Sequence, residues 1–445
     1  MDIDKSKLVL INETEQRIVD QPLETKEIGY YKDAWNRFKK NKASLVAFII
    51  ICILFFFVIF GPYFKKYDYK RLGETEGVKM QYLPPRVKGL EKLGIFNGHK
   101  KITKGKKFLV DLYNTPGIGK KTILNMPKEL QDDDPSNDGK YANVSSLTVK
   151  VNMYYYTQYI NSYRNEANEL ATRKITRDDY EKLLKEGKIL ELVAVNPEKT
   201  QYEVRLDFFK FAFDQTPEDT YFWFGTDSSG RDLFTMLWQG ARISLAMALS
   251  IVIINSIIGI TIGAISGYYG GTFDLLFDRF VEILSSIPFL AVLTLLIIRF
   301  GTTVGIIILA FTVTGWIGSY QMSRMQFYRY KNREYILAAR TLGASDARIM
   351  FKHIFPNAIG YMVTSFALSI PNFVFTEATY SYLKIINYSN ATSVGLLLEQ
   401  GQAVMQTQPH LLLFPAIYIA LLMITFNLFG NGLRDAFNPS LRGAE

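Results

Sequence analysis

Six long apolar segments constrain this sequence more than any other feature does. They cover residues 43–60, 243–266, 282–300, 304–320, 361–375 and 411–430. A helix needs ~20 apolar residues to cross the hydrocarbon core of a bilayer, with ~17 as the practical lower limit. The first segment carries no charge, whereas polar residues and Pro371 interrupt the fifth. One such segment could be a buried helix of a soluble protein, but six together predict an α-helical polytopic membrane protein.

Basic residues predict how the segments are oriented. Residues 31–42, directly before the first segment, contain a dense basic group: Lys32, Arg37, Lys39, Lys40 and Lys42. Basic residues beside a span mark its cytoplasmic side, so we expect both termini of a six-span chain to be cytoplasmic. Tyr31, Trp35 and Phe38 share one helical face, which predicts an amphipathic elbow helix at the membrane surface. The net charge of +9 therefore indicates membrane topology and not a nucleic-acid partner.

This topology divides the chain into four regions. Residues 1–42 form the cytoplasmic N-terminal segment with the elbow, and 43–63 form the first transmembrane helix. Residues 64–222 are too long for a simple connection and predict a folded α+β insertion outside the cell. Residues 223–445 hold the other five transmembrane helices. Within that core, residues 323–358 form a polar loop on the cytoplasmic side, and the seven basic residues at 324–352 agree with that side.

The insertion has its own pattern of elements. Residues 144–160 and 200–213 alternate and are rich in β-branched and aromatic residues, which predicts strands. Between them, Thr176 is a candidate N-cap and Gly187 a candidate helix stop, while residues 131–140 predict a loop. A group of tyrosines suits either a recognition surface or packing within the insertion's own sheet. This group comprises Tyr154, Tyr155, Tyr156 and Tyr159.

Residues 331–360 are polar and basic and lie between two apolar segments, a pattern typical of a docking element. A helix is predicted from Glu334 to Leu342, where Gly343 interrupts it. Ser345 and Asp346 can cap a second helix that runs to Phe355 and ends before Pro356. The small pair Ala338 and Ala339 would let another backbone approach closely, among the basic side chains of Arg340, Arg348 and Lys352.

A second motif leads into the second apolar segment. Residues 224–245 contain Gly225, Gly230 and Gly240, which permit tight turns. Four charged residues there can pair with one another near the outer surface, namely Asp227, Arg231, Asp232 and Arg242. The residues Gly225-Thr226-Asp227 and Gly230-Arg231-Asp232 match the GTDxxGRD signature of C-type permease subunits in full. The chain thus resembles the permeases of the oligopeptide and dipeptide ABC importer family.

The resemblance covers residues 30–63 and 221–445, and the insertion lies outside it. It continues through residues 286–290 and 426–442. In the polar loop the family pattern E-A-A-x-x-x-G becomes Leu337-Ala338-Ala339 with Gly343, so Leu337 stands where the family has glutamate. The family resemblance assigns ATPase coupling to this loop, through Ala338, Ala339, Arg340, Gly343, Asp346 and Pro356.

The resemblance implies the type I ABC importer permease fold and a set of partners. These are a second homologous permease in a heterodimer, two cytoplasmic ABC ATPases and an extracellular peptide-binding lipoprotein in a bacterial cell membrane. ATP and Mg would be bound by the ATPases and no cofactor by this chain. Oligopeptides would move inward by alternating access, with the insertion as a dock or lateral cap. Importers of dipeptides or metal chelates, and mechanotransmission permeases that pass no solute, remain open alternatives.

Polar residues within the apolar segments are candidates for lining a pathway, or for bonding a neighbouring helix. They are Asn255, Thr294, Ser369 and Asn372, with Glu377 near the outer end of the fifth span as a peptide contact or a solvated rim charge. Salt bridges that brace the third span are expected from Asp274, Asp278, Arg279 and Glu282. Kinks in the helices are expected at Pro288, Pro371 and Pro415.

Residues 117–122 resemble a phosphate loop, but Asn114 replaces the required glycine. With no nucleophile–base set and no metal spacing, we expect no enzyme activity from this chain.

Overall fold

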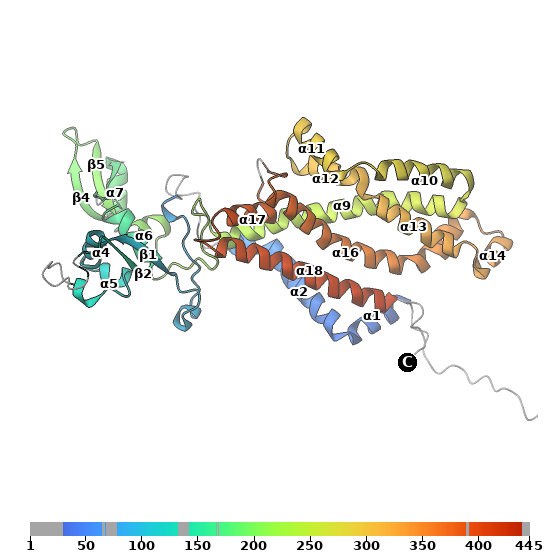
Figure 1. Cartoon of the computed structure of the whole chain (residues 1–445), viewed down its shortest axis with the longest axis horizontal. Helices are drawn as coiled ribbons and strands as arrows, with labels where there is room; N and C mark the ends of the chain where they lie inside the picture. Colours follow the sequence, from blue (N-terminus) through green and yellow to red (C-terminus); the bar gives the residue numbers. More distant parts are fainter. Residues whose placement is uncertain are drawn as a thin grey trace, which may run out of the picture.

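A computed structural model describes residues 30–64, 67, 78–131, 141, 143–165, 167, 169–388 and 391–437 (Figure 1). The segment before residue 30, most of the predicted loop at 131–140 and the last eight residues lie outside the described part. A bundle of long helices forms one part of the molecule, and an α+β unit extends from one end of it. We call this unit, residues 78–222, the inserted unit. The opposite end of the bundle carries the polar loop, and we call it the loop end.

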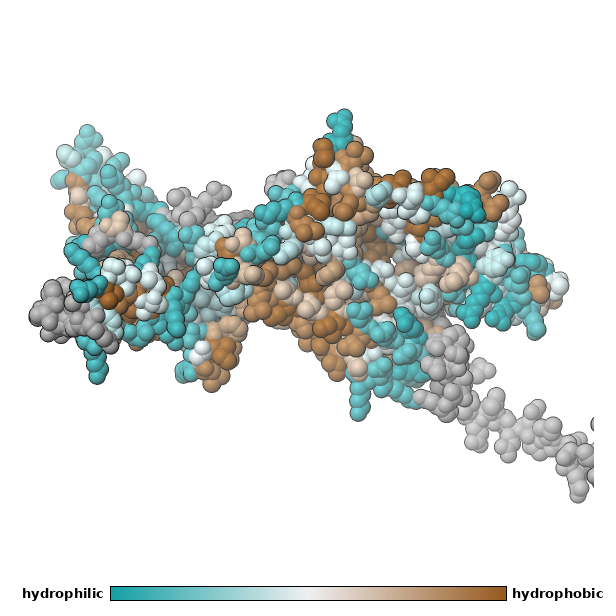
Figure 2. All heavy atoms as spheres, in the orientation of Figure 1, coloured by the Kyte–Doolittle hydropathy of each residue, from teal (hydrophilic) through white to brown (hydrophobic). Residues whose placement is uncertain are grey.

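Five helices are long and apolar enough to cross a membrane, and a bent pair could form a sixth span. The continuous helices are α2 (Lys42–Phe60), α9 (Leu233–Tyr269), α12 with α13 (Val304–Gly315 and Ile317–Tyr330), α16 (Phe355–Tyr382) and α18 (His410–Phe437). Figure 2 shows apolar side chains over the middle of these helices and hydrophilic ones over the inserted unit and the loop end. The predicted polytopic α-helical architecture is confirmed.

The third predicted span is not one continuous helix. Helix α10 (Gly271–Ser285) and helix α11 (Phe289–Phe300) are bent by 68° at a short break. Pro288 occupies the N-cap position of α11 with an extended ψ of 121°. A proline lacks the N–H that would continue the first helix, so the chain can turn here. In contrast, Pro371 and Pro415 lie inside α16 and α18.

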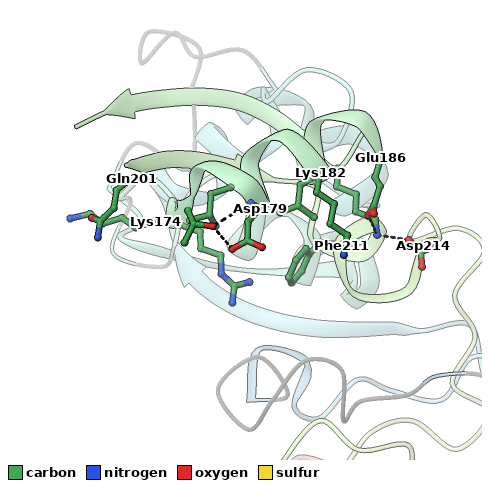
Figure 3. Close-up of a pocket in the computed structure, with 12 residues that line it drawn as sticks. Lys174, Asp179, Lys182, Glu186, Gln201, Phe211 and Asp214 are labelled. Carbon is green, nitrogen blue, oxygen red and sulfur yellow. Dashed lines mark hydrogen bonds and ion pairs between the residues drawn. The ribbon is translucent and has the colours of Figure 1, made fainter. Parts of the chain in front are cut away.

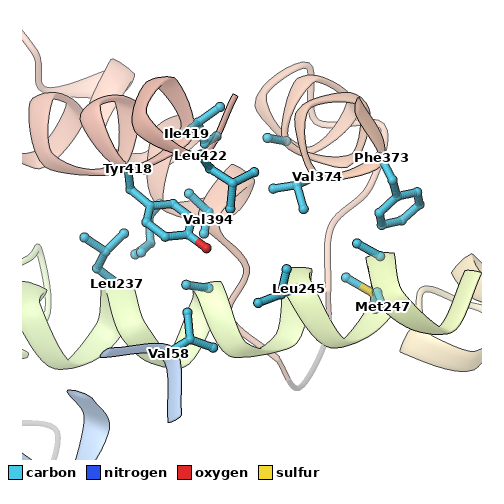
Figure 4. Packing of buried hydrophobic residues seen from close by; sticks show 14 of the residues in the cluster. Val58, Leu237, Leu245, Met247, Phe373, Val374, Val394, Tyr418, Ile419 and Leu422 are labelled. Atoms are coloured by element: carbon cyan, nitrogen blue, oxygen red, sulfur yellow. The ribbon is translucent and has the colours of Figure 1, made fainter. Parts of the chain in front are cut away.

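The bundle core brings together helices that are distant in sequence. Val58 of α2, Leu245 of α9, Val374 of α16 and Leu422 of α18 belong to one buried cluster (Figure 4). The short helix α17 (Val394–Ala403) adds Val394 to that cluster, although the sequence pattern did not predict a helix there. Burial of this apolar cluster fixes the arrangement of α9, α16 and α18, since close-packed interiors leave little freedom.

The predicted elbow is helix α1 (Tyr30–Lys40). Phe38 is buried against Phe429 of α18 and Phe48 of α2, whereas Trp35 stacks on Phe38 and keeps an exposed edge. The elbow is thus held to the loop end of the bundle by aromatic packing.

The inserted unit contains two small antiparallel sheets. In the first, β1 (His99–Gly105) pairs with β2 (Ser146–Asn152), with Thr103 opposite Thr148. In the second, the strand order is β3 (Arg173–Thr176), β5 (Gln201–Leu206) and β4 (Ile189–Val195). The helices are α4 (Lys106–Tyr113), α5 (Gly119–Thr122), α6 (Met153–Ser162), α7 (Arg177–Lys185) and α8 (Phe208–Phe213). Short 3-10 turns cover Gly61–Phe64, Val78–Met80, Leu90–Leu93 and Lys128–Leu130.

Both predicted strands of the insertion are too long. The first ends at Asn152, whose side chain accepts a hydrogen bond from Tyr154 N at 3.1 Å and starts α6. The second ends at Leu206, and Asp207 caps α8 in the same way. An N-cap favours helix over the alternating pattern that follows it. The caps predicted for α7 are confirmed: Thr176 accepts from Asp179 N, and Gly187 follows the helix with a φ of +65°.

The tyrosines of α6 mostly face the interior. Tyr154, Tyr156 and Tyr159 are buried, and Tyr155 is half-buried with its hydroxyl on Glu218. The prediction that Tyr154, Tyr156 and Tyr159 form a recognition surface is therefore wrong. They pack the inserted unit itself, as the alternative interpretation expected.

Candidate functional site

The predicted start of the polar loop is too early, because residues 323–330 belong to α13; the helix that follows ends in a complete C-capping motif. Helix α14 (Glu334–Thr341) is followed by Gly343 at a φ of +82°. Gly343 N donates to Arg340 O, and Ala344 N donates to Ala339 O, both at 3.0 Å. These two bonds define the Schellman motif, in which a left-handed residue is needed and glycine adopts it without strain.

The second predicted loop helix does not end before Pro356. Helix α15 (Asp346–Arg348) continues through a π-helical turn (Ile349–Ile354) directly into α16. Pro356 lies in the first turn of α16, where its missing N–H is tolerated. The expectation of two separate short helices is therefore wrong, because the second one is the end of a membrane helix. Ser345 takes the N-cap position, but its side chain makes no capping hydrogen bond.

The loop has one buried face and one exposed apolar face. Ile336, Ile349 and Ile354 are fully buried in a cluster that includes Tyr268 of α9. On the other side, Leu342 is 88% exposed and Phe351 is 72% exposed. Leu337, at the position of the family's glutamate, is also exposed. Contiguous exposed apolar patches mark interaction sites, so these three side chains are candidates for contact with a partner protein.

Tyr268 connects this loop to the end of α9. Its hydroxyl donates to Oδ1 of Asp346 at 2.6 Å, and Arg340 Nη2 donates to the same hydroxyl at 3.3 Å. Lys331 Nζ also reaches the Tyr268 carbonyl oxygen, at 3.4 Å. The two predicted loop residues Arg340 and Asp346 are thus brought together by a tyrosine that the sequence analysis did not single out.

Helix α9 is joined to α13 along a stripe of three glycines. A Cβ atom at Gly263 or Gly267 would lie 2.4 Å from a backbone oxygen of α13, and one at Gly259 would lie 2.5 Å from the backbone oxygen of Trp316, the N-cap of α13. Such a spacing of small residues lets two membrane helices touch backbone to backbone. The pattern G-x-x-x-G-x-x-x-G is visible in the sequence and could have predicted this contact. We call these three residues the glycine seam.

An ion pair extends the connection from α13 to α10. Arg324 binds Asp274 with two bonds, Nε to Oδ1 at 2.5 Å and Nη2 to Oδ2 at 2.7 Å, and also pairs with Asp278 at 3.3 Å. Two parallel bonds fix the orientation of both side chains. The predicted bracing role of Asp274 and Asp278 is confirmed, with a partner on α13, while Arg279 and Glu282 pair with each other.

The GTDxxGRD residues form a turn that joins the two ends of the insertion. Thr226 is fully buried; its Oγ1 accepts from Leu83 N at 2.8 Å and lies 2.5 Å from the carbonyl oxygen of Met80. Asp227 accepts from Arg231 Nε at 2.7 Å. Gly225 and Gly230 both have positive φ, and a Cβ at Gly225 would lie 2.3 Å from Leu83 O. We call residues 225–232 the signature turn.

Asp232 has a different role from the predicted ion pair. Its carboxylate caps α9 by accepting from the backbone N–H groups of Phe234 and Thr235. Burial raises the pKa of this carboxyl, and the hydrogen bonds from Thr235 oppose that shift. Arg242 also departs from the prediction, since it donates to the carbonyl oxygens of Val58 and Ile59 at the end of α2.

The five pathway candidates divide into two groups. Glu377 is 0% exposed and accepts from the hydroxyls of Ser244, Ser381 and Tyr388 at 3.0–3.1 Å. The interpretation of Glu377 as a solvated rim charge is therefore wrong. It holds α9, α16 and the following loop together.

Asn255 is also buried and donates to Phe311 O of α12 at 3.3 Å. The remaining three candidates are accessible in this chain. Thr294 and Ser369 are half-buried and bond carbonyl oxygens of their own helices, and Asn372 is exposed. Pathway lining stays a prediction for these three.

One cavity lies in the inserted unit, away from the membrane helices. It has a volume of about 710 Å³ and is bordered by α7, β3 and the turn after α8 (Figure 3). Several of its polar side chains pair within the protein: Lys188 pairs with Asp214 at 2.6 Å and with Glu186 at 2.7 Å, and Thr176 donates to Asp179. These pairs use much of the charge at the cavity wall, and we assign no ligand to it.

Two known protein families match parts of this chain. The family described as "Binding-protein-dependent transport system inner membrane component" matches residues 259–443. The family described as "N-terminal TM domain of oligopeptide transport permease C" matches residues 29–85. Neither match covers residues 86–258, which include most of the inserted unit.

Individual relatives are also permease subunits of peptide transport systems. The oligopeptide transport system permease protein OppC of Bacillus subtilis is 40% identical over 229 residues, which are 52% of this chain and 75% of that protein. The dipeptide transport system permease protein DppC of the same organism is 39% identical over 227 residues, covering 51% of this chain and 71% of that protein. A solved structure of the inward-facing MetNI methionine ABC transporter matches 44% of this chain and 96% of that chain, with 20% identity and a TM-score of 0.36.

Proposed function

Because this chain belongs to the family of binding-protein-dependent transport system inner membrane components, we propose that it moves oligopeptides into the cell as one permease subunit of an ATP-driven importer. Relatives named as oligopeptide and dipeptide permeases support a peptide substrate. As a permease it would carry no catalytic residues, and partner ATPases would bind ATP and Mg.

The observation that carries the proposal is the rigid attachment of the polar loop. The loop presents Leu342 and Phe351 to solvent while Tyr268 and the buried isoleucines hold it to α9. An ATPase that bound this exposed face would move the loop as one body. The displacement would then pass to α9, across the glycine seam to α13, and through Arg324 to α10. Alternating access requires such a connection between the ATPase and the membrane helices.

The orientation follows from the same proposal. The loop end carries the basic residues of α1 and of the polar loop, so it would face the cytoplasm, with the inserted unit outside the cell. A second, homologous permease would cover the accessible side of the bundle and complete the pathway. Since a peptide carries its own backbone donors and acceptors, a weakly polar pathway suffices, and a peptide-binding lipoprotein can supply specificity.

The inserted unit would serve as a dock for the binding protein or for the partner permease. Arg86 N donates to Phe222 O at 2.8 Å, so the two ends of the unit lie side by side. Replacing residues 87–221 by a short Gly-Ser linker would therefore remove the unit and keep the signature turn. Loss of uptake at limiting peptide, with uptake restored at saturating binding protein, is the expected result. Unchanged uptake by a folded complex would contradict the docking role.

Uptake tests the proposal as a whole. The gene is deleted from its host, and ATP-dependent entry of a labelled pentapeptide is followed with and without the restored chain. We expect loss of entry and its rescue. A Gly318→Ala chain serves as the matched control, since Gly318 has open space around its Cβ position. Unchanged entry in the deletion strain, with no redundant system, would move the substrate to a dipeptide or a metal chelate, or leave a signalling role.

A further inference from the structure

A cavity of about 490 Å³ lies at the loop end between three membrane helices. Its walls come from the end of α13, the start of α16 and the end of α18, which lie at the same end of the bundle as α14 (Figure 1). The polar side chains used below are Gln326, Arg329, Arg333, Asn357, Tyr361 and Arg434. None of them has a role in the proposed ATPase coupling.

Three arginines border this cavity without a carboxylate among them. Arg329, Arg333 and Arg434 come from three different segments, and none has an acidic side chain within 4.0 Å in the described part of the chain. No aspartate or glutamate lines the cavity. Three like charges around one hollow repel one another, and an anion between them would offset that repulsion.

A buried amide faces the same cavity. Gln326 is only 6% exposed, and its side chain has no hydrogen-bond partner among the described residues. The amide atoms are not among the fully buried polar atoms that lack a partner, so they keep access to the cavity and are available to a ligand there. A ligand with oxygen acceptors would satisfy the Gln326 N–H groups, and the Asn357 amide at the cavity wall could add to this.

We propose that this cavity binds the phosphate of an anionic phospholipid headgroup. Guanidinium groups bind phosphate with paired hydrogen bonds, and basic pockets between membrane helices on the cytoplasmic side suit lipid headgroups. The position at the ends of three spans places the site at headgroup depth, with the aromatic rings of Tyr361 and Phe437 on its wall. The site depends on membrane insertion alone and not on the substrate of the importer.

Native mass spectrometry of the purified full-length chain tests the site. Retention of phosphatidylglycerol is compared with retention of phosphatidylcholine at equal concentration, and we expect preferential retention of the anionic lipid. Arg333→Gln and Arg434→Gln should each weaken it by about fivefold, since a basic residue near an anionic headgroup contributes ~1 kcal/mol. Gln326→Leu should also weaken it without changing the charge. Arg348→Gln is the matched control, an exposed arginine at the same end that does not line the cavity.

Further measurements distinguish a lipid phosphate from the phosphate of a soluble ligand. Binding of glycerol 3-phosphate as tight as that of the lipid would keep the phosphate site and assign it to a soluble ligand. Equal retention of phosphatidylglycerol by the wild type and by the Arg333→Gln/Arg434→Gln variant, both folded by thermal unfolding, would overturn the proposal. Equal retention of phosphatidylcholine would overturn it as well. Displacement of bound lipid by a pentapeptide but not by glycerol 3-phosphate would assign the cavity to the transport route instead.

Discussion

The hydroxyl of Tyr268 lies 2.6 Å from Oδ1 of Asp346, so the last turn of α9 is bonded to the first residue of the helix that becomes α16. Arg340, from the end of α14, reaches the same hydroxyl. One side chain therefore links three helices at the loop end. Motion of the loop has a direct mechanical route into α9, and from there into α13.

Removing that hydroxyl should uncouple ATP hydrolysis from transport. Tyr268→Phe keeps the ring in its cluster but loses a hydrogen bond to a carboxylate, which contributes about 1.5–3 kcal/mol. We expect the ATPase rate of the assembled importer to persist while peptide uptake per ATP falls severalfold. Tyr269→Phe is the control, because Tyr269 is exposed and neighbours Tyr268. An unchanged ratio of uptake to hydrolysis in Tyr268→Phe would refute the route.

A side chain at Gly343 should impair coupling without preventing membrane insertion. The φ of +82° there costs an L-residue roughly 1–2 kcal/mol, although no atom lies within 4 Å of the Cβ position. Gly343→Asp should therefore give a membrane-inserted chain whose loop no longer couples the ATPase. Asparagine adopts this conformation more readily, so Gly343→Asn should reduce coupling less than Gly343→Asp does. Normal ATP-driven transport by Gly343→Asp would contradict this expectation.

The glycine seam should be intolerant of even one methyl group. In Gly263→Ala the new Cβ would lie 2.4 Å from the carbonyl oxygen of Tyr320, which is backbone and cannot rotate away. Overpacking of this kind costs about 1–3 kcal/mol. We expect a lower unfolding temperature in detergent, read by static light scattering or intrinsic fluorescence. Gly305→Ala, a helical glycine with open space, should leave the unfolding temperature unchanged, and an equal loss in both would argue against the seam.

Loss of the Thr226 hydroxyl should loosen the signature turn. Thr226→Val keeps the shape but leaves Leu83 N without its acceptor, a loss of about 1–3 kcal/mol for a buried group. Hydrogen exchange of the peptide that contains Leu83 should accelerate by roughly 5- to 150-fold. Thr226→Ser should restore protection, and Ser228→Ala, at an exposed site, should not change it. Persistent protection in Thr226→Val would mean that the other contacts hold the turn.

The first sheet of the inserted unit should lose stability on mild acidification. Burial, and then the charges of Lys150 and Arg86, lower the pKa of His99 below its usual value near 6.5. Near and below pH 6.5 the unfolded unit binds a proton that the folded unit does not. The stabilising contribution of neutral His99 is therefore complete above pH 6.5, and the free energy of unfolding falls as the pH drops through that value.

Hydrogen exchange of β1 and β2 at pH 7 and pH 5, corrected for the intrinsic rate, should show this loss. The loss should be smaller in His99→Gln and unaltered in His353→Gln, which changes a histidine of the π-helical turn. The same pH slope in wild type and His99→Gln would assign the effect to other groups.

Local signals in the sequence predicted much of the fold. Apolar length located the spans, Thr176 located a helix start, and Gly343 located a helix end, because each depends on neighbours within a few residues. A bend at Pro288 was predicted, but its size of 68° was not, since a proline permits a bend without setting its size.

Long-range contacts were the main source of error. The burial of Glu377 was not predicted because its hydroxyl partner Ser244 lies 133 positions away, and nothing local indicates that pairing. Tyr268 was missed for the same reason, since Asp346 is 78 positions distant. The roles that the resemblance assigns to the candidate site residues of the loop and the turn stay predictions for the experiments above.

The pairing of Leu83 with Thr226 has a consequence for how such a chain can change over time. The bond brings Leu83 and Thr226 together at one end of the bundle. The segment between these two residues therefore starts and ends at the same place. Residues can be inserted or deleted in that segment without shifting the position of any membrane helix. A transporter with this junction can acquire an entire extra domain in a single genetic event and keep its transport machinery intact.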